Sequence, residues 1–309
     1  MTDIVITEFM DEAAVQDYLG GYSVLYDPKL VDDPPRLLNA LSDCRALIVR
    51  NRTQVRAAVI DVASSLRVVG RLGVGLDNID VAACTARGIK VFPATGANDL
   101  AVAEYVLCAT MMLLRRAWLS SAEVASGAWP REKLIGQELA AKKLGLIGFG
   151  AIARLTASKA RALGMPVAAY DPFVPADDAA WLGTECLDLP ALLSTSDVIS
   201  LHIPLTPQTR HLIDAAAITT MKQGALVVNA ARGGVIDEEA LVAALRCGRL
   251  GGAAIDVFER EPMSAAAGTA WQGLNNVILT PHIAGVTAES NIRVSQMIAR
   301  TVRDALLAT

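Results

Sequence analysis

Short apolar runs alternate with longer segments of helical periodicity along nearly the whole chain. The runs have the length of buried strands, and the segments between them can form the helices that connect parallel strands. This alternation predicts an α/β fold. We expect strands at residues 4–7, 23–26, 46–49, 67–69, 90–92, 144–147, 167–170, 197–201, 225–229, 252–255 and 276–279. We expect helices at residues 12–19, 35–41, 53–63, 100–120 and 287–307, and one that follows the strand 144–147 and ends near residue 163.

The composition argues against several classes of partner. The chain has 309 residues, of which 53% are hydrophobic and 19% charged, and its net charge is −4 without any basic run. Nothing therefore attracts a nucleic-acid backbone or an anionic membrane surface. The most apolar helix candidate, residues 100–114, is shorter than the roughly 20 residues that span a bilayer and contains Glu104. No basic and apolar leader is visible at the N-terminus, so we expect a cytoplasmic protein.

Cysteine spacing gives no sign of a metal site or a disulfide framework. The five cysteines are odd in number and scattered, and they form neither a CxxC pair nor a cluster with histidines. We therefore expect reduced thiols and no bound metal.

The strand at 144–147 runs directly into a glycine-rich turn, Gly148-Phe-Gly150-Ala-Ile-Ala153, that opens a helix. Gly148 permits a tight turn, Gly150 leaves room for a pyrophosphate, and Ala153 allows the helix to pack closely on the strand. Such a pattern alone also occurs in ordinary turns. Here the next strand ends in Asp171, whose carboxylate can accept the ribose hydroxyls of adenosine and repel a 2′-phosphate. The sequence therefore predicts a dinucleotide site that prefers NAD to NADP.

Three segments after this turn end strands with residues that can carry chemistry: Arg232, Glu261 and His282. Each alone is more simply explained as a surface ion pair or a satisfied polar residue. Beside a dinucleotide site they make a hydride transfer possible. His282 can take the proton of a hydroxyl, Glu261 can stabilise the imidazolium, and Arg232 can hold a carboxylate and polarise a carbonyl.

The chain resembles the NAD-dependent D-2-hydroxyacid dehydrogenases, from the loop at Val74-Gly75 and the segment 102–104 through the glycine turn to the arginine, glutamate and histidine segments. The resemblance implies hydride transfer between NAD and the C2 carbinol of a 2-hydroxy acid, with those three residues catalytic. It also implies that the amides of Val74 and Gly75 hold the substrate carboxylate. The cofactor contacts that we expect are Gly148, Gly150, Ala151, Ile152, Asp171, His202, Pro204, Thr209, Ala230, Asp256 and Gly285.

Length and resemblance together predict two doubly wound parallel-sheet domains. Residues 1–98 are expected to form the first part of a flavodoxin-like substrate domain, residues 99–285 the Rossmann NAD-binding domain, and residues 286–309 a C-terminal helix that returns to the substrate domain. The apolar helix 100–120 and an exposed arm at 126–137 are what a homodimer interface would use. An intramolecular core helix remains an equal alternative.

Arg50 and Arg71 end strands of the first domain and match arginines that bind substrate phosphate in phosphoglycerate-oxidising members of the family, while Arg52 adds a nearby charge. We therefore expect a substrate with a second anionic group, such as 3-phosphoglycerate or 3-sulfolactate. The alternatives are surface ion pairs at these arginines with a monoanionic substrate (glycerate or hydroxypyruvate, glyoxylate, or lactate), and a non-enzymatic NAD-sensing protein like the corepressors of this fold. A formate dehydrogenase is disfavoured, because such enzymes place an amide where Glu261 stands.

Overall fold

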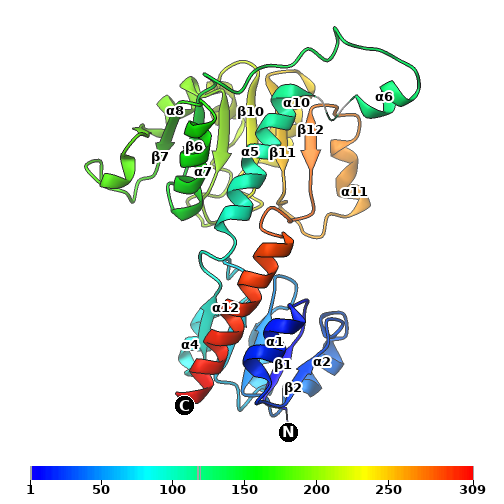
Figure 1. Ribbon diagram of the computed structural model, residues 1–309, viewed down its shortest axis with the longest axis vertical. Coiled ribbons are helices and arrows are strands. Elements are labelled where there is room, and N and C mark those ends of the chain that lie inside the picture. Colours follow the sequence, from blue (N-terminus) through cyan, green and yellow to red (C-terminus); the bar gives the residue numbers. More distant parts are fainter. Residues whose placement is uncertain (1, 117, 119, 309) are drawn as a thin grey trace. The chain divides into compact units, whose positions relative to one another are not determined.

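The computed structural model describes residues 2–116, 118 and 120–308, which form two compact units. One unit comprises the chain up to Asn98 together with the segment from Val286 onward, and the other runs from Asp99 to Gly285 (Figure 1). In each unit every strand pairing is parallel, and helices cover both faces of the sheet. The predicted class of two doubly wound parallel sheets is confirmed.

The first unit contains a five-stranded sheet in the order β2-β1-β3-β4-β5, the arrangement of flavodoxin-like folds. Its strands are β1 (Ile4–Ile6), β2 (Val24–Tyr26), β3 (Ala46–Val49), β4 (Val68–Arg71) and β5 (Lys90–Pro93). Its helices are α1 (Glu12–Leu19), α2 (Pro34–Ala40), α3 (Ala57–Val62), α4 (Val81–Ala86) and α12 (Ala288–Leu307), with a 3₁₀ turn at Leu30–Asp32.

Helix α12 belongs to the core of this unit. Thr287 and Ser290 form a capping box at its start, so backbone N–H groups at the N-terminus of the helix are hydrogen-bonded where the chain re-enters the unit. The apolar side of α12 packs with α1 against one face of the sheet. The helix approaches β4 closely at Gly70, where an added Cβ would lie 2.6 Å from Ile298. A larger residue at this position would push the helix off the sheet.

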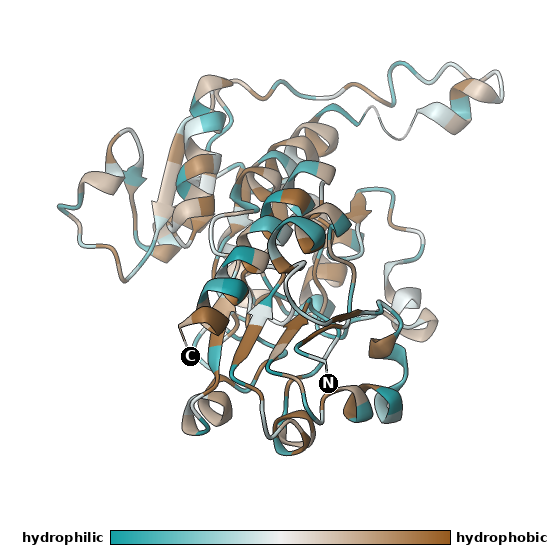
Figure 2. Ribbon diagram, turned by 60° about the horizontal axis from the view of Figure 1, so that its bottom comes forward, coloured by the Kyte–Doolittle hydropathy of each residue, from teal (hydrophilic) through white to brown (hydrophobic). Residues whose placement is uncertain are grey.

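The second unit contains a seven-stranded sheet in the order β12-β11-β10-β9-β6-β7-β8. Its strands are β6 (Leu144–Ile147), β7 (Val167–Tyr170), β8 (Glu185–Cys186), β9 (Val198–Leu201), β10 (Ala225–Asn229), β11 (Leu250–Ile255) and β12 (Val277–Leu279). Its helices are α5 (Asp99–Arg115), α6 (Ser121–Ala125), α7 (Ala151–Ala162), α8 (Leu189–Thr195), α9 (Ala215–Thr220), α10 (Glu238–Arg246) and α11 (Ala265–Gly268), with 3₁₀ turns at Ala179–Trp181 and Thr269–Trp271. Helices α5 and α7 bury one face of the sheet, and α8, α9 and α10 bury the other. Many of the strands are brown in Figure 2, as expected of apolar strands covered by helices.

Some predicted boundaries are wrong. The helix expected to run to residue 120 ends at Arg115, because Arg116 adopts a left-handed φ of 53°. Residues 117 and 119 of that expectation lie outside the described part of the chain. The helix expected at 53–63 is reduced to Ala57–Val62, and β8 is a strand that the sequence pattern did not reveal. Among the described residues, no helix combines the length and hydropathy needed to cross a membrane.

Candidate active site

The glycine turn after β6 has the shape that a dinucleotide requires. Gly148 has a φ of 87°, and a Cβ there would lie 2.7 Å from the carbonyl oxygen of His202. Gly150 is the N-cap of α7 but offers no side chain to it, and a Cβ at this position would meet open space. The first N–H groups of a 12-residue helix therefore face a clear approach, which suits the pyrophosphate of NAD.

Asp171 follows β7 and lies against this turn. One carboxylate oxygen accepts a hydrogen bond from the N–H of Phe149 at 2.8 Å, and the other accepts from the N–H of Phe173 at 2.9 Å. Each oxygen can accept one more bond, so the carboxylate can still receive ribose hydroxyls. Its negative charge opposes a 2′-phosphate, and the site as built fits NAD rather than NADP.

The loop after β9 carries three of the expected cofactor contacts. The hydroxyl of Thr209 donates to the carbonyl of Pro204 and accepts from the N–H of Thr206, each at 2.7 Å, and so closes the loop. His202 has its Nε2 3.0 Å from the hydroxyl of Ser200, and desolvation by burial lowers its pKa to about 4. An imidazole with so low a pKa is a weak base at neutral pH, so His202 is a poor candidate for the proton transfer.

The other expected cofactor contacts also lie at the carboxyl ends of the strands or next to them. Ala151 and Ile152 begin α7, Ala230 follows β10, Asp256 follows β11, and Gly285 is the last residue of the second unit. Ligands of doubly wound sheets bind at this edge. Asp256 is buried, and its carboxylate is taken up by residues of the loop that contains His282.

His282 and Glu261 form a close pair. Nδ1 of His282 lies 2.6 Å from one oxygen of Glu261, and the other oxygen accepts from the N–H of Phe258 at 2.9 Å. Burial would raise the pKa of Glu261, but these two hydrogen bonds and the charges of His282 and Arg232 outweigh it and hold the pKa below its usual value. The side chains of His282 and Glu261 are 35% and 30% exposed, so a ligand can reach the pair.

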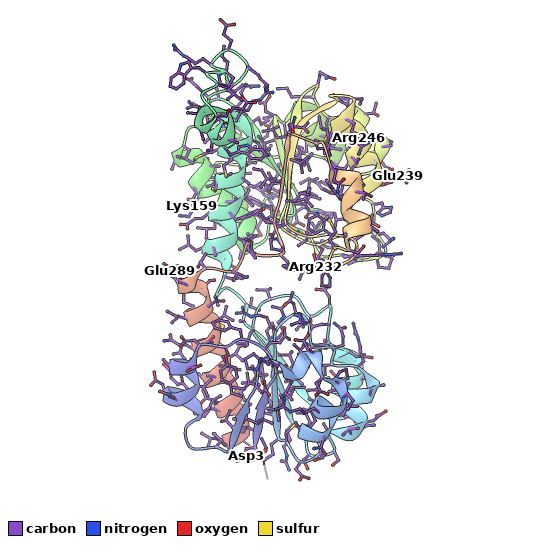
Figure 3. The ribbon with its side chains drawn as sticks, turned by 90° about the vertical axis from the view of Figure 1, so that its right-hand side faces the viewer. Asp3, Lys159, Arg232, Glu239, Arg246 and Glu289 are labelled. Carbon is purple, nitrogen blue, oxygen red and sulfur yellow. The ribbon has the colours of Figure 1, made fainter. Side chains whose placement is uncertain are left out.

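Arg232 lies at the same edge of the sheet, just beyond β10. Asn229 donates to the carbonyl of Arg232 at 2.9 Å and so fixes the turn, and Nη1 of Arg232 donates to the carbonyl of Ala231 at 2.5 Å. In Figure 3 Arg232 is at one edge of this unit and Arg246, at the end of α10, is at the other. The structure thus brings together the guanidinium, carboxylate and imidazole that the sequence singled out, and the charge of Arg232 acts on Glu261.

The first unit places its expected substrate residues after β3 and β4. Nη2 of Arg50 donates to Asn291 of α12 at 2.8 Å, and the guanidinium lies over the ring of Phe9 at 5.6 Å. Desolvation lowers the pKa of Arg50, with the nearby charge of Glu8 opposing this. Nη1 of Arg71 donates to the carbonyl of Leu72 at 3.1 Å.

The same loops contain the amides of Val74 and Gly75 and the side chain of Arg52. Among the described residues, the N–H groups of Val74 and Gly75 have no acceptor, so they are available to a carboxylate. Arg52 forms an ion pair with Asp32 at the surface, which is the alternative that the sequence left open for these arginines.

Two residues of this site escaped the sequence interpretation. Glu8 follows β1 and is buried, and its carboxylate accepts the N–H groups of Arg50, Arg52 and Thr53 at 2.9, 3.1 and 3.0 Å. Asn78 donates to the carbonyls of Arg50 and Thr53 at 3.1 and 2.7 Å. Together they hold the loop after β3. Glu8 could have been found from the sequence, because it is an acid directly after the first predicted strand, at the edge of the sheet where ligands bind.

Comparison with known proteins gives consistent matches. Residues 107–284 match the family model of the D-isomer specific 2-hydroxyacid dehydrogenase, NAD binding domain. An (S)-sulfolactate dehydrogenase of Chromohalobacter salexigens is 54% identical over 307 residues, which cover 99% of both chains. A D-3-phosphoglycerate dehydrogenase of Synechocystis is 38% identical over 99% of this chain, which spans only 54% of that relative. The solved structure of D-lactate dehydrogenase from Aquifex aeolicus, complexed with NAD and lactic acid, has a TM-score of 0.89 at 28% identity and covers 99% of this chain and 96% of its own.

Proposed function

The chain belongs to the family of D-isomer specific 2-hydroxyacid dehydrogenases, and we propose that its substrate carries a second anion at carbon 3, with 3-sulfolactate fitting best. As a member of this family it is an NAD-dependent oxidoreductase. The observation that carries the choice of acid is the placement of Arg50. The similarity to (S)-sulfolactate dehydrogenase over the full length of both chains supports it.

We assign the chemistry of the reaction to three side chains of the second unit. His282 removes the proton of the C2 hydroxyl in the oxidation and returns it in the reduction. Glu261, at 2.6 Å, stabilises the imidazolium that forms, and Arg232 offers paired donors to the substrate carboxylate. The nicotinamide of NAD, when bound, accepts or supplies the hydride.

Arg50 favours an anionic tail because its guanidinium is desolvated and one of its nitrogens is free. Among the described residues, Nε of Arg50 is buried and makes no hydrogen bond. A buried donor without an acceptor is unfavourable by about 1–3 kcal/mol, and a sulfonate or phosphate oxygen would relieve it. The charge of Glu8 acts on this guanidinium and offsets part of its positive charge. A sulfonate, with one negative charge, therefore suits the site better than a phosphate dianion.

The test is a panel of acids with NAD, in which NADH formation is followed by absorbance. We expect 3-sulfolactate to have a higher kcat/KM than 3-phosphoglycerate, glycerate and lactate. Arg50→Ala should raise KM for 3-sulfolactate by about 10–100-fold, the size of one charge-assisted hydrogen bond, and should hardly affect lactate. Arg52→Ala is the matched control, because Arg52 is paired with Asp32.

Two results would contradict this proposal. A higher kcat/KM for lactate or glycerate than for both 3-sulfolactate and 3-phosphoglycerate would refute the proposal that the substrate carries a second anionic group. Binding of NAD without turnover of any acid would instead favour the NAD-sensing alternative.

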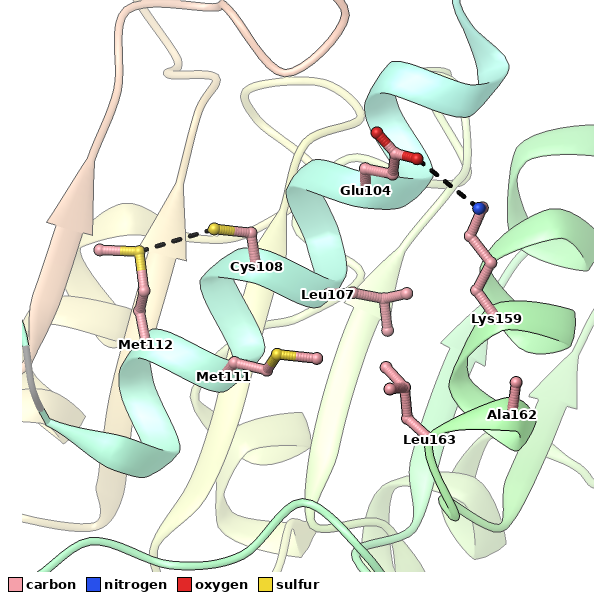
Figure 4. A pocket seen from close by; sticks show the side chains of 8 residues that line it. All are labelled: Glu104, Leu107, Cys108, Met111, Met112, Lys159, Ala162 and Leu163. Carbon is pink, nitrogen blue, oxygen red and sulfur yellow. Dashed lines mark hydrogen bonds and ion pairs between the residues drawn. The ribbon is translucent and has the colours of Figure 1, made fainter.

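We also infer that two copies of the chain associate through α5 and α7. A shallow apolar hollow of about 520 Å³ lies between these helices, with Glu104 and Lys159 paired at one end of it (Figure 4). Trp129 and Ile135 of the neighbouring arm are 74% and 72% exposed, which is unusual for such large apolar side chains. Sedimentation should give a dimer, and Leu163→Glu within the hollow should weaken it. A monomeric wild-type protein at micromolar concentration would refute this interface.

Finally, we propose that the protein works in the cytoplasm. All five cysteines are free thiols, as expected of a protein kept in a reducing compartment. Cell fractionation would test this, and recovery of the protein outside the cytoplasmic fraction would contradict it.

A further inference from the structure

A chain of hydrogen bonds connects helix α5 to the loop that carries His282. The phenol oxygen of Tyr105 lies 2.5 Å from the hydroxyl oxygen of Thr280, and this hydroxyl donates to Oδ1 of Asp256 at 2.6 Å. A threonine hydroxyl has one proton, which here goes to Asp256, so Tyr105 must be the donor to Thr280. We propose that Tyr105 and Thr280 are positioning residues for the proton transfer, acting through Asp256 on the backbone of His282.

Asp256 holds the loop of His282 at several points. Oδ1 accepts the N–H of Ile283 and Oδ2 accepts the N–H of Ala284, each at 2.8 Å. The carbonyl of Asp256 accepts the N–H of His282 itself, also at 2.8 Å. His282 has a φ of 57°, in the left-handed region that a side chain other than glycine adopts only when its surroundings hold it there. The direction of the imidazole therefore depends on the placement of the Asp256 carboxylate.

The hydrogen bonds from Tyr105 through Thr280 also influence the charge of the Asp256 carboxylate. Burial raises the pKa of Asp256, whereas the hydroxyl of Thr280, the two N–H groups and the charge of His282 lower it. Burial likewise raises the pKa of Tyr105 to about 12, so the phenol keeps its proton and remains a donor. Donation from Tyr105 polarises the hydroxyl of Thr280 and strengthens its bond to Asp256.

Two other titratable groups, Cys108 and Glu261, lie near these hydrogen bonds. Cys108, one turn along α5, acts weakly on Tyr105 and makes no bond to Thr280. Glu261 contacts Nδ1 of the imidazole and responds in turn to the charge of Arg232. Glu261 therefore contacts the imidazole itself, whereas Asp256 holds the backbone of His282.

The test compares Tyr105→Phe, Thr280→Val and Thr280→Ser. The matched control is Thr110→Val, which removes a hydroxyl of α5 that bonds only the carbonyl of Val106 one turn earlier. We expect kcat to fall about tenfold in Tyr105→Phe, the size of one hydrogen bond, and about 100-fold in Thr280→Val, which also leaves the phenol of Tyr105 without an acceptor. Thr280→Ser keeps the hydroxyl and should recover most of the activity.

Two further readouts separate positioning from a purely structural role. Loss of a donor weakens the hold on the Asp256 carboxylate and, through it, on the backbone of His282, so the acid limb of the kcat profile should be displaced in Thr280→Val and, less far, in Tyr105→Phe. The chain has three histidines, so the ring signals of His282 can be followed by NMR without cofactor or substrate. They should shift in these two variants and stay in place in Thr110→Val.

The inference rests on the proposed catalytic role of His282 but not on the choice of acid, so rates are measured with whichever acid of the panel reacts fastest. It is overturned if Tyr105→Phe and Thr280→Val lose thermal stability while their pH profiles and His282 signals match those of Thr110→Val. Shifted His282 signals in a protein that turns over no acid would uphold the hydrogen-bond chain and refute the proposed function alone.

Discussion

Replacing Glu261 with glutamine tests the assignment of the proton transfer most directly. The amide has nearly the same shape, and its oxygen can still accept from Nδ1 of His282, although its NH2 group then faces the N–H of Phe258. What is lost is the negative charge 2.6 Å from the imidazole. A shift of the profile along the pH axis in Glu261→Gln therefore reports on this charge, whereas a fall in rate without a shift would follow from the lost acceptor of the Phe258 N–H.

The size of the effect follows from the geometry and exposure of the pair. A hydrogen bond between charged groups contributes about 1.5–3 kcal/mol when it is shielded from water. Both side chains of the pair are about a third exposed, at 35% and 30%, and screening reduces this to about 1–1.5 kcal/mol. That corresponds to about one pH unit, or about tenfold in rate.

The sign follows from the need for a neutral imidazole in the oxidation. Glu261→Gln removes the negative charge that stabilises the imidazolium formed when the C2 hydroxyl gives up its proton. The acid limb of kcat/KM should therefore move down by about one unit, while the plateau of kcat falls about tenfold because the imidazole is a weaker base. Initial rates of NADH formation across the neutral pH range, at saturating NAD, measure both.

The same segment supplies a matched control. Glu259 lies 3.0 Å from Nε2 of His211, a second pair of carboxylate and imidazole that has no role in the proposed reaction. Glu259→Gln should leave the profile unchanged. If the profile of Glu261→Gln also coincides with that of the wild-type protein, the stabilisation of the imidazolium by Glu261 is refuted and the pair is structural.

Three further predictions concern other parts of the site. Asp171→Ala should reduce the preference for NAD over NADP by about 10–100-fold in a competition titration, and an unchanged preference would remove Asp171 from the cofactor site. His202 has a pKa of about 4 against 6.5 when free, so the folded state loses up to about 3 kcal/mol as pH falls through this window. The free energy of unfolding of His202→Gln, measured in urea, should not show this loss at acid pH. An equal loss in the variant would contradict the assignment to His202. Glu8→Gln loses one acceptor for a buried N–H, so unfolding should be easier by about 1–3 kcal/mol and KM for the anionic acid higher.

Much of this fold could be predicted because its signals are local. The apolar runs of β6 and β10 correspond to the predicted strands, since a strand buried on both faces needs consecutive apolar residues. The glycine turn was recognisable for the same reason, because Gly148 and Gly150 meet backbone and ligand requirements within one turn. Parallel strands end at a common edge, so placing Arg232 and His282 after strands was enough to predict that they lie at the same edge.

The contacts that were missed join residues far apart in sequence. Glu8 is 42 positions from Arg50, and Tyr105 is 175 positions from Thr280. Neither partner has a local pattern that points to the other. The loop held by Glu8 and Asn78 also explains the late start of α3, since the backbone of residues 50–53 is bonded to side chains rather than to a helix.

A common device holds the functional loops of both units. Glu8, Asp171 and Asp256 each follow a strand, and each carboxylate accepts backbone N–H groups of the loop that it supports. A carboxylate suits this position because both of its oxygens accept, whereas an amide has only one accepting oxygen and a donor that would face the N–H groups. An acid at the end of a parallel strand therefore predicts first of all that its carboxylate holds a neighbouring loop. Any contact that it makes with a ligand uses the lone pairs that the backbone leaves free.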